Sequence, residues 1–422
     1  MKFNEEKNSQ AAILGLQHLL AMYSGSILVP ILIAGALNYS ASDLTYLIST
    51  DIFMCGIATF LQLQLNKHFG IGLPVVLGVA FQSVAPLSMI GARHGAGAMF
   101  GSIIASGIFT VLIAGVFSKI RRLFPPIVTG SVITTIGLTL IPVAVGNMGD
   151  NASKPSFESL SLAMLTVLVI LLVSIFAKGF IKSIAILIGL VVGTIVAGFY
   201  GQVSTEAIAQ APWVHLPIPF FFGKPVFELS SIIMMCIIAL VSMVESTGVY
   251  LALADITGDE LLEKRLRNGY RAEGLAVMLG GIFNTFPYTG FSQNVGLVQL
   301  SGIRSRRPIY FTAGFLVLLG VLPKFGALAQ MIPSPVLGGG MLIMFGMVAV
   351  QGIRMLATAT DFENNDHNLL IAAVSIASGV GFNGSHLFDS LGGNAQMFLT
   401  NGVVMAALVS IILNLIFNRK KI

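Results

Sequence analysis

Apolar stretches long enough to cross a lipid bilayer follow one another along almost the whole of this 422-residue chain. A bilayer span needs about 20 predominantly apolar residues, and only 10% of the residues are charged, against roughly 25% in soluble domains. The pattern therefore predicts an all-α polytopic membrane protein. The predicted spans cover residues 12–37, 44–66, 72–90, 96–117, 126–147, 160–177, 181–199, 229–255, 269–284, 288–302, 307–331, 334–357, 367–385 and 396–417.

The distribution of basic residues indicates how these fourteen spans are oriented. An even number of spans places both termini on one side, and lysines and arginines concentrate in cytoplasmic loops. Nineteen of the 23 basic residues lie on the side of the termini. The four on the opposite side are Arg93, Lys154, Lys224 and Lys324. We expect a multi-pass protein of the plasma membrane with cytoplasmic termini, and we attribute the net charge of +5 to this topology and not to nucleic-acid binding.

The segment Asn284–Ser301 lies between two long apolar runs, yet it contains amides, hydroxyls, a proline and two glycines. Pro287 and Gly290 would break a continuous helix here, and the freed backbone groups cannot face lipid. The segment must therefore be buried in protein or line a cavity. Gln293 and Asn294 follow the break, where a half-helix would begin. This arrangement is typical of a solute-binding site in a transporter.

Two pairs of similar motifs indicate that the chain contains an internal repeat. Residues Pro125–Gly130 resemble Pro333–Gly338 at an offset of 208, and Phe81–Val84 resemble Phe291–Asn294 at an offset of 210. Offsets near half the chain length predict two halves of seven spans each. An odd number of spans inverts the second half relative to the first, a plan that recurs among transporters. The alternative is that prolines and glycines recur by chance, which nearly equal offsets make a weaker explanation.

Glu245 lies well inside the apolar span at 229–255. A carboxylate within a membrane span costs several kcal/mol, and such residues normally face a cavity or a partner. We expect Glu245 to bind a substrate and to hold or exchange a proton. The alternative interpretation is that neighbouring hydroxyls satisfy this carboxylate and that it has no part in transport.

Side chains on both broken segments could recognise a planar solute. The amides of Gln293 and Asn294 offer donors and acceptors that match the lactam or imide edge of a purine or pyrimidine base. Ser292 adds a hydroxyl beside them, and Phe81 could supply a stacking face. Glu245 could accept hydrogen bonds from ring N–H groups. The alternative is that Gln293 and Asn294 only cap broken backbone.

Three further titratable residues lie within apolar spans. Glu273, near the start of the ninth span, belongs to a proton route or pairs with Arg271. His18, in the first span, is a third proton-coupling candidate, although such a residue is more often a packed, hydrogen-bonded histidine. We assign no role to Asp51. Because the motifs of metalloenzymes and phosphate-binding loops are missing from the sequence, we predict no metal, no cofactor and no enzymatic activity.

Taken together, the polar residues resemble the pattern of the nucleobase–ascorbate transporter (nucleobase:cation symporter-2) family. Its signature reads Gln or Glu, Asn, any residue, Gly, four residues, Thr, then Arg, Lys or Gly. The similarity runs along the whole chain and most resembles bacterial xanthine permeases. The residues that carry it are Gln17 and His18 in the first span, Glu245 in the eighth, and Gln293, Asn294, Gly296, Ser301 and Gly302 in the tenth.

The resemblance implies a core domain and a gate domain, each built from both halves of the chain. The core would comprise residues 1–122 (spans 1–4) and 201–332 (spans 8–11). The gate would comprise residues 123–200 (spans 5–7) and 333–422 (spans 12–14). Spans 3 and 10 would each contain a short β-strand that pairs near the substrate. Similar proteins are commonly dimers, which implies a homodimer.

The resemblance also implies which residues contact the substrate. Relatives bind the base through the counterparts of Glu245 and Gln293, with an aromatic residue at the position of Phe81. Uracil-transporting members tend to have Glu where this chain has Gln293, which favours a purine. Two positions depart from the family pattern. Ser301 keeps the hydroxyl of the usual Thr, whereas Val249 stands where several relatives carry Asp or His, so no coupling role can be transferred to it.

These observations predict a secondary active importer of xanthine, or of uric acid, driven by symport with protons rather than sodium. One alternative is an anion transporter of the sulfate or bicarbonate type, which shares the seven-plus-seven plan but favours a cationic site. A second alternative is a uracil-type pyrimidine permease. A channel is distinguished by uptake that neither saturates nor accumulates substrate.

Overall fold

The computed structural model describes residues 8–120, 124–302, 304–359, 362 and 366–418. Over these residues the chain is mainly helical, with two short strands, β1 (Leu77–Val79) and β2 (Tyr288–Gly290). The predicted boundary at residues 122 and 123 and both terminal segments lie outside the described residues. The helices are α1 (Asn8–Ser26), α2 (Leu28–Ala36), α3 (Ala41–Leu63), η1 (Phe81–Ser83), α4 (Val84–Ile120), α5 (Pro126–Met148), α6 (Phe157–Phe176), α7 (Gly179–Ser183), α8 (Ala185–Phe199), α9 (Glu206–Gln210), α10 (Leu229–Thr257), α11 (Glu263–Ile282), α12 (Ser292–Ser301), α13 (Arg307–Gly320), α14 (Pro323–Gln330), α15 (Ser334–Ala359), α16 (Asp366–Phe382), η3 (His386–Phe388), α17 (Gly393–Leu399) and α18 (Gly402–Phe417).

Helices of membrane-spanning length dominate the described part of the chain. Seven helical stretches there are long and apolar enough to cross a bilayer, and two bent pairs raise the number to nine. The pair α13 and α14 bends by 80°, and the pair α17 and α18 bends by 76°. The shorter helices α8 and α16 are also apolar. An all-α membrane protein with two short strands, as predicted, is thereby confirmed.

Predicted spans 3 and 4 are joined in one long element, α4, which is interrupted at a single glycine. Gly95 has a φ of 81° and a ψ of 172° inside the helix. Residues other than glycine rarely adopt a positive φ, so this residue permits the kink between the two spans. The interruption falls within the predicted loop between residues 90 and 96.

The helices that carry the broken segments pack closely on one another. Helices α3, α4, α10, α11 and α13 form one set of contacts, which α1 joins through α13. Glycines allow the closest approaches: a Cβ on Gly107 of α4 would overlap the backbone of α11, and a Cβ on Gly56 of α3 would overlap that of α13. Under the predicted repeat, α3 (span 2) corresponds to α11 (span 9), and α4 (span 4) corresponds to α13 (span 11). The repeat therefore relates the contact between α3 and α13 to the contact between α11 and α4.

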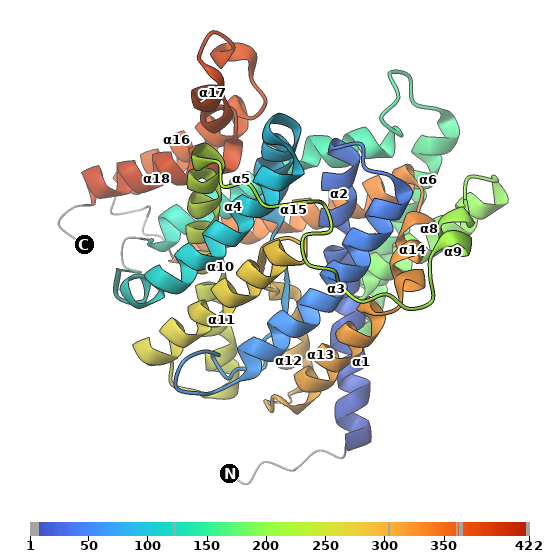
Figure 1. Ribbon diagram of the computed structural model, residues 1–422, viewed down its shortest axis with the longest axis horizontal. Helices are drawn as coiled ribbons and strands as arrows, with labels where there is room; N and C mark the ends of the chain where they lie inside the picture. The colour runs from blue at the N-terminus through green and yellow to red at the C-terminus, as the bar shows by residue number, and fades with distance from the viewer. Residues whose placement is uncertain (1–7, 121–123, 303, 360–361, 363–365, 419–422) are drawn as a thin grey trace.

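A second set of helices is centred on α5 and α15, which are also predicted repeat mates. A Cβ on Gly137 of α5 would overlap the backbone of α15 at Ala349, and a Cβ on Gly352 of α15 would overlap α5 at Thr134. Helix α5 contacts α16 and α18, and α15 contacts α6 and α8. In Figure 1, α16 and α18 lie at one edge of the molecule, and α6 and α8 lie toward the opposite edge.

The two strands join the halves of the chain in an antiparallel pair. Leu77 lies opposite Gly290, Gly78 opposite Thr289, and Val79 opposite Tyr288. Beyond the strands, the Phe291 N–H donates to the Val76 carbonyl at 2.9 Å, and the Ala80 N–H donates to the Pro287 carbonyl, also at 2.9 Å. Backbone groups that the breaks release are thereby satisfied within the protein, as the membrane interior requires.

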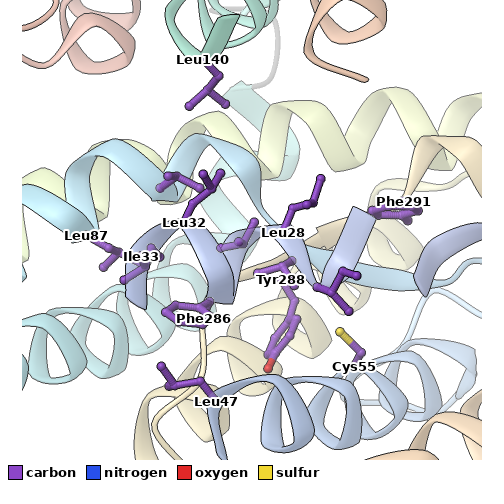
Figure 2. Packing of buried hydrophobic residues seen from close by; sticks show 14 of the residues in the cluster. Leu28, Leu32, Ile33, Leu47, Cys55, Leu87, Leu140, Phe286, Tyr288 and Phe291 are labelled. Carbon is purple, nitrogen blue, oxygen red and sulfur yellow. The ribbon is translucent and has the colours of Figure 1, made fainter. Parts of the chain in front are cut away.

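Apolar side chains cover this strand pair from several helices. Leu28, Leu32 and Ile33 of α2 belong to the largest buried cluster, together with Tyr288 and Phe291. Figure 2 shows these side chains gathered around the strands. Their packing holds the broken segments away from lipid, so the adjoining polar residues are placed inside the protein.

Helix α10 begins at a carboxylate cap. Glu228 accepts hydrogen bonds from the Ser230 N–H at 3.1 Å, the Ser231 N–H at 2.6 Å and both serine hydroxyls. Partial burial alone would raise the pKa of Glu228, but the bonds from Ser230 and Ser231 outweigh it and hold the pKa at about 2, below the ordinary 4.5. The cap is therefore strongest when this carboxylate is ionised.

We expect Glu228→Gln to destabilise the protein at neutral pH by about 1 kcal/mol, because glutamine keeps an acceptor oxygen but loses the charge that strengthens the hydrogen bonds. Because the folded pKa is depressed, this stabilisation is present above the unfolded pKa and is lost as pH falls from about 4.5 towards about 2. Thermal unfolding of the detergent-solubilised protein across this range should show the two curves converging at low pH. Glu206→Gln, at an exposed position in α9, is the control, and a pH-independent difference for Glu228→Gln would contradict the assignment.

Candidate substrate site

Glu245 lies at the centre of a polar cluster where α10 passes the strand pair. Its Oε2 accepts a hydrogen bond from Gln82 Nε2 at 2.9 Å and one from Thr289 Oγ1 at 3.3 Å. The side chain is half-buried. Since both bonds go to one oxygen, Oε1 keeps its capacity to accept from a solute.

Gln82 is a member of this cluster that the sequence pattern did not assign to the site. It is 2% exposed, and its Nε2 also donates to Ser242 Oγ at 2.9 Å. The residue lies in η1, directly after β1, and reaches α10 across 163 positions of sequence. Its place next to Phe81 in the repeated motif was the signal that could have identified it.

Strand β2 contacts α10 through backbone and side-chain groups. The Ser246 hydroxyl accepts from the Gly290 N–H at 3.1 Å and lies 3.0 Å from Thr289 Oγ1. A Cβ on Gly290 would come within 3.0 Å of Val249, so these two residues are in close packing. Val249, which stands where several relatives carry a polar side chain, therefore makes an apolar contact in this chain.

Helix α12 begins immediately after β2 and carries the predicted recognition residues in its first turn. Gln293 is half-buried and Ser292 is exposed. The only hydrogen bond of the Gln293 side chain among the described residues is a weak one of 3.4 Å from the Ser292 hydroxyl. The amide of Gln293 can therefore turn to bind a solute.

Asn294 is buried on the opposite side of this turn, where it binds α1. Its Nδ2 donates to the His18 carbonyl and to His18 Nδ1, both at 3.1 Å. The Asn294 Oδ1 atom is buried and has no partner among the described residues. A buried acceptor without a partner is costly, which favours a ligand or a water at this position. His18 is 4% exposed.

The aromatic residue predicted to stack on a base is half-buried. The ring of Phe81 meets Phe345 of α15 edge-on, with centroids 5.9 Å apart. Phe291 instead packs against glycines, because Cβ atoms on Gly25 and Gly78 would come within 2.7 and 2.6 Å of its ring. These glycines make room for Phe291 between α1 and β1. Phe345 was not identified from the sequence, because its apolar helix contains nothing to mark it.

Glu273 forms a second buried polar cluster behind the first. Its Oε2 accepts from the Tyr250 hydroxyl at 2.9 Å, and Gln62 Nε2 donates to that hydroxyl at 2.5 Å. The described residues show no ion pair between Glu273 and Arg271, which was the alternative role considered for this residue. A cavity of about 10 Å³ lies between Glu273 and Ser242, close to the volume that one water needs.

The predicted site residues therefore fall into three neighbouring groups. Glu245 forms one with Gln82 and Thr289, neither of which was predicted, Asn294 forms one with His18, and Glu273 forms one with Tyr250 and Gln62. Gln293 and Ser292 begin the helix that joins the first two groups. The segments around the strand pair thus carry a carboxylate acceptor, an amide with one weak hydrogen bond and an aromatic ring, which are groups that could recognise a small planar molecule with several N–H and carbonyl groups.

Comparisons with known proteins agree on the kind of protein to which this chain is similar. It matches, over residues 9–387, the model of a family described as "Permease family". The uric acid permease PucK of Bacillus subtilis (strain 168) is 50% identical over 422 residues, or 99% of this chain and 98% of the relative. The xanthine permease of the same organism is 49% identical over 409 residues, or 96% and 93%.

Solved structures show where the fold occurs elsewhere. The transmembrane domain of the cyanobacterium bicarbonate transporter BicA superimposes with a TM-score of 0.63, over 96% of this chain and 97% of that chain. The sequences are 16% identical, so the likeness concerns the fold alone. It confirms the predicted seven-plus-seven arrangement.

Proposed function

Because this chain belongs to the nucleobase:cation symporter-2 family of permeases, we propose that it imports xanthine, with uric acid as a second substrate, by secondary active transport. The family resemblance found in the sequence is confirmed. Two relatives, at 50% and 49% identity, are named for uric acid and for xanthine. The chemistry of the candidate site supports the same class of substrate.

The observation that carries this proposal is the free hydrogen-bonding capacity of Glu245 and Gln293 beside the strand pair. The unoccupied Oε1 of Glu245 accepts from a ring N–H of the purine. The loosely held amide of Gln293 donates to a ring carbonyl and accepts from the adjacent N–H. A side-chain amide offers this combination of donor and acceptor, and oxidised purines present the matching edge several times.

Further contacts complete the proposed pose. Phe81, whose ring is half-buried and nearly perpendicular to that of Phe345, would stack on the face of the base. Asn294 supports the first turn of α12 through His18 and offers Oδ1 as a further acceptor. Ser292, which is exposed, contributes a hydroxyl.

Access to this site would alternate by movement of one set of helices against the other. We assign residues 1–122 and 201–332 to the core domain and residues 123–200 and 333–422 to the gate domain. The helix contacts described above support this division, because α3, α4, α11 and α13 pack with one another and α5, α6, α8, α15, α16 and α18 do likewise. The Phe81–Phe345 contact would open and close between them.

Proton symport is proposed on the basis of two carboxylates inside membrane spans that have no cationic partner. Neither Glu245 nor Glu273 takes part in an ion pair in the described part of the chain. Ser242, bonded to Gln82, and the small cavity beside it connect the region of Glu245 with Glu273. A change in the protonation of His18 would change its hydrogen bond with Asn294. The same proposal places both termini in the cytoplasm of a bacterial cell and includes a homodimer.

Two other substrate classes are the alternatives. The fold likeness to a bicarbonate transporter is compatible with anion transport, but Glu245 disfavours an anion and the site contacts described include no arginine or lysine. A pyrimidine such as uracil is disfavoured by Gln293. Neither class appears in the names of the two relatives described above.

Uptake of labelled xanthine by cells that express the chain tests the proposal. Excess unlabelled xanthine, uric acid, guanine, uracil or bicarbonate would compete in separate arms, with cells carrying an empty vector as control. We expect saturable uptake that xanthine and uric acid block and that collapse of the proton gradient abolishes. Competition mainly by uracil or bicarbonate, or uptake proportional to concentration, would overturn the substrate or the transport mode.

A further inference from the structure

Asp51 is a buried carboxylate in the middle of α3 that the proposed transport mechanism does not use. Its exposed fraction is 0%, and it takes part in no ion pair among the described residues. Burial of a carboxylate is costly unless hydrogen bonds compensate for the lost water. Its partners therefore indicate why the residue is present.

The partners of Asp51 come mainly from the segment that leads into β2. The Tyr288 hydroxyl donates to Asp51 Oδ1 at 3.2 Å and lies 2.6 Å from Thr285 Oγ1. The backbone N–H of Phe286 also faces the carboxylate. The remaining partner is the thiol of Cys55, 3.9 Å from Oδ2. In Figure 2 the hydroxyl of Tyr288 points at α3, between Leu47 and Cys55, and Asp51 is four residues from each of these in the sequence.

The alternation of side chains along a strand connects this contact with the substrate site. Successive residues of a strand point to opposite faces. Tyr288 points to α3 and Asp51, whereas Thr289 points to α10, where it contacts Glu245 at 3.3 Å and Ser246 at 3.0 Å. A shift or rotation of β2 would therefore move Thr289 relative to Glu245.

We propose that Asp51 is a positioning residue for substrate binding, and that it holds the Thr285–Tyr288 segment against α3 so that Thr289 meets Glu245. The strand has three residues, so its own ladder is short. Asp51 supplies a side-chain anchor from α3 on one face of β2, and Ser246 and Glu245 of α10 hold the other face. This inference rests on the proposed function of the Glu245 site, but the anchoring of β2 can be measured without a substrate.

The groups around Asp51 favour a positioning role for this residue over a role in proton transfer. The titratable groups that face it are Tyr288 and Cys55, and no basic side chain is among its contacts. Its protein partners are all donors, and its hydrogen bonds do not join the chain that links Gln82, Ser242 and Glu245. The anchor requires an acceptor at Oδ1, which asparagine also provides.

The test compares Asp51→Ala, Asp51→Asn and Tyr288→Phe with Ser49→Ala. Ser49 is equally buried on α3, and its hydroxyl bonds only within that helix. We expect Asp51→Ala and Tyr288→Phe each to raise KM for xanthine about tenfold, as for loss of one hydrogen bond, with a smaller change in kcat. Asp51→Asn should stay within about threefold of the wild type because the acceptor remains, and Ser49→Ala should match the wild type.

Two further measurements make the proposal falsifiable. In a Thr289→Ala background, Asp51→Ala should have little additional effect on KM, since it acts through Thr289. Hydrogen–deuterium exchange without substrate should show faster exchange of the Tyr288–Phe291 amides in Asp51→Ala than in Ser49→Ala.

Unchanged exchange and KM in Asp51→Ala and Tyr288→Phe would overturn the proposal. So would an Asp51→Asn protein that exchanges xanthine but no longer accumulates it, because that result assigns Asp51 to proton transfer. If the wild type binds neither purine, the proposed function fails while the exchange result still decides the anchor.

Discussion

Glu245→Gln is expected to abolish accumulation of xanthine and to weaken its binding roughly 100-fold. A hydrogen bond to a charged group contributes about 1.5–3 kcal/mol, and each 1.4 kcal/mol is about a tenfold change in affinity. Glutamine has nearly the same shape, and its oxygen still accepts from Gln82 or Thr289. The loss would therefore report the charge of the carboxylate and its ability to exchange a proton.

Equilibrium binding to the purified protein and uptake by cells should be measured together. The matched control is Glu263→Gln, which removes an exposed carboxylate from the first turn of α11 and should leave both quantities unchanged. A Glu245→Gln protein with wild-type affinity and accumulation would show that this carboxylate is only a structural element of the strand–helix contact. Retained binding with lost accumulation would restrict its role to proton coupling.

Gln293→Ala is expected to remove high-affinity uptake while leaving membrane insertion intact. The amide would make two neutral hydrogen bonds to the base, each worth about 1 kcal/mol, so affinity should fall about 30-fold. Folding should be little affected, because Gln293 is half-buried and its side chain makes only a weak hydrogen bond with Ser292 among the described residues. The side chain is thus available for recognition at small cost to the protein.

The control for this variant is Gln299→Ala, which removes the same side chain from an exposed position on α12. Surface expression of both variants should equal that of the wild type, as measured by labelling of an epitope tag. Unchanged transport kinetics in Gln293→Ala would exclude this residue from substrate recognition. Reduced expression of both variants would instead indicate that α12 tolerates little change.

Hydropathy and repeats were sufficient to predict the fold, because the membrane allows few solutions. Pro287 and Gly290 predicted a broken segment, and the structure has β2 and α12 there. The boundary of α11 was less accurate: this helix begins at Glu263, six residues before the predicted start at 269. Its first turns carry charged residues that favour helix but not the membrane, so a search for apolar windows omits them.

The candidate site was predicted only as far as local pattern allows. Glu245, Gln293 and Asn294 are conspicuous because polar side chains are rare in apolar spans. The contact between Gln82 and Glu245 joins residues 163 positions apart, which no local pattern records. Asp51 was assigned no role for the same reason, since its partner Tyr288 is 237 positions away and looks like an ordinary aromatic residue.

The register of the strand pair makes the junction between the two halves self-complementary. At the offset of 210, Gly78 corresponds to Tyr288 and Val79 to Thr289. The repeat therefore relates the pair Gly78–Thr289 to the pair Val79–Tyr288. It relates the pair Leu77–Gly290 to the pair Ala80–Pro287 in the same way. Such a contact has the symmetry of an isologous dimer interface. Two copies of a half-length chain, inserted in opposite orientations, could form these backbone bonds without a linker, so the junction is compatible with descent from a seven-span protein that paired with itself.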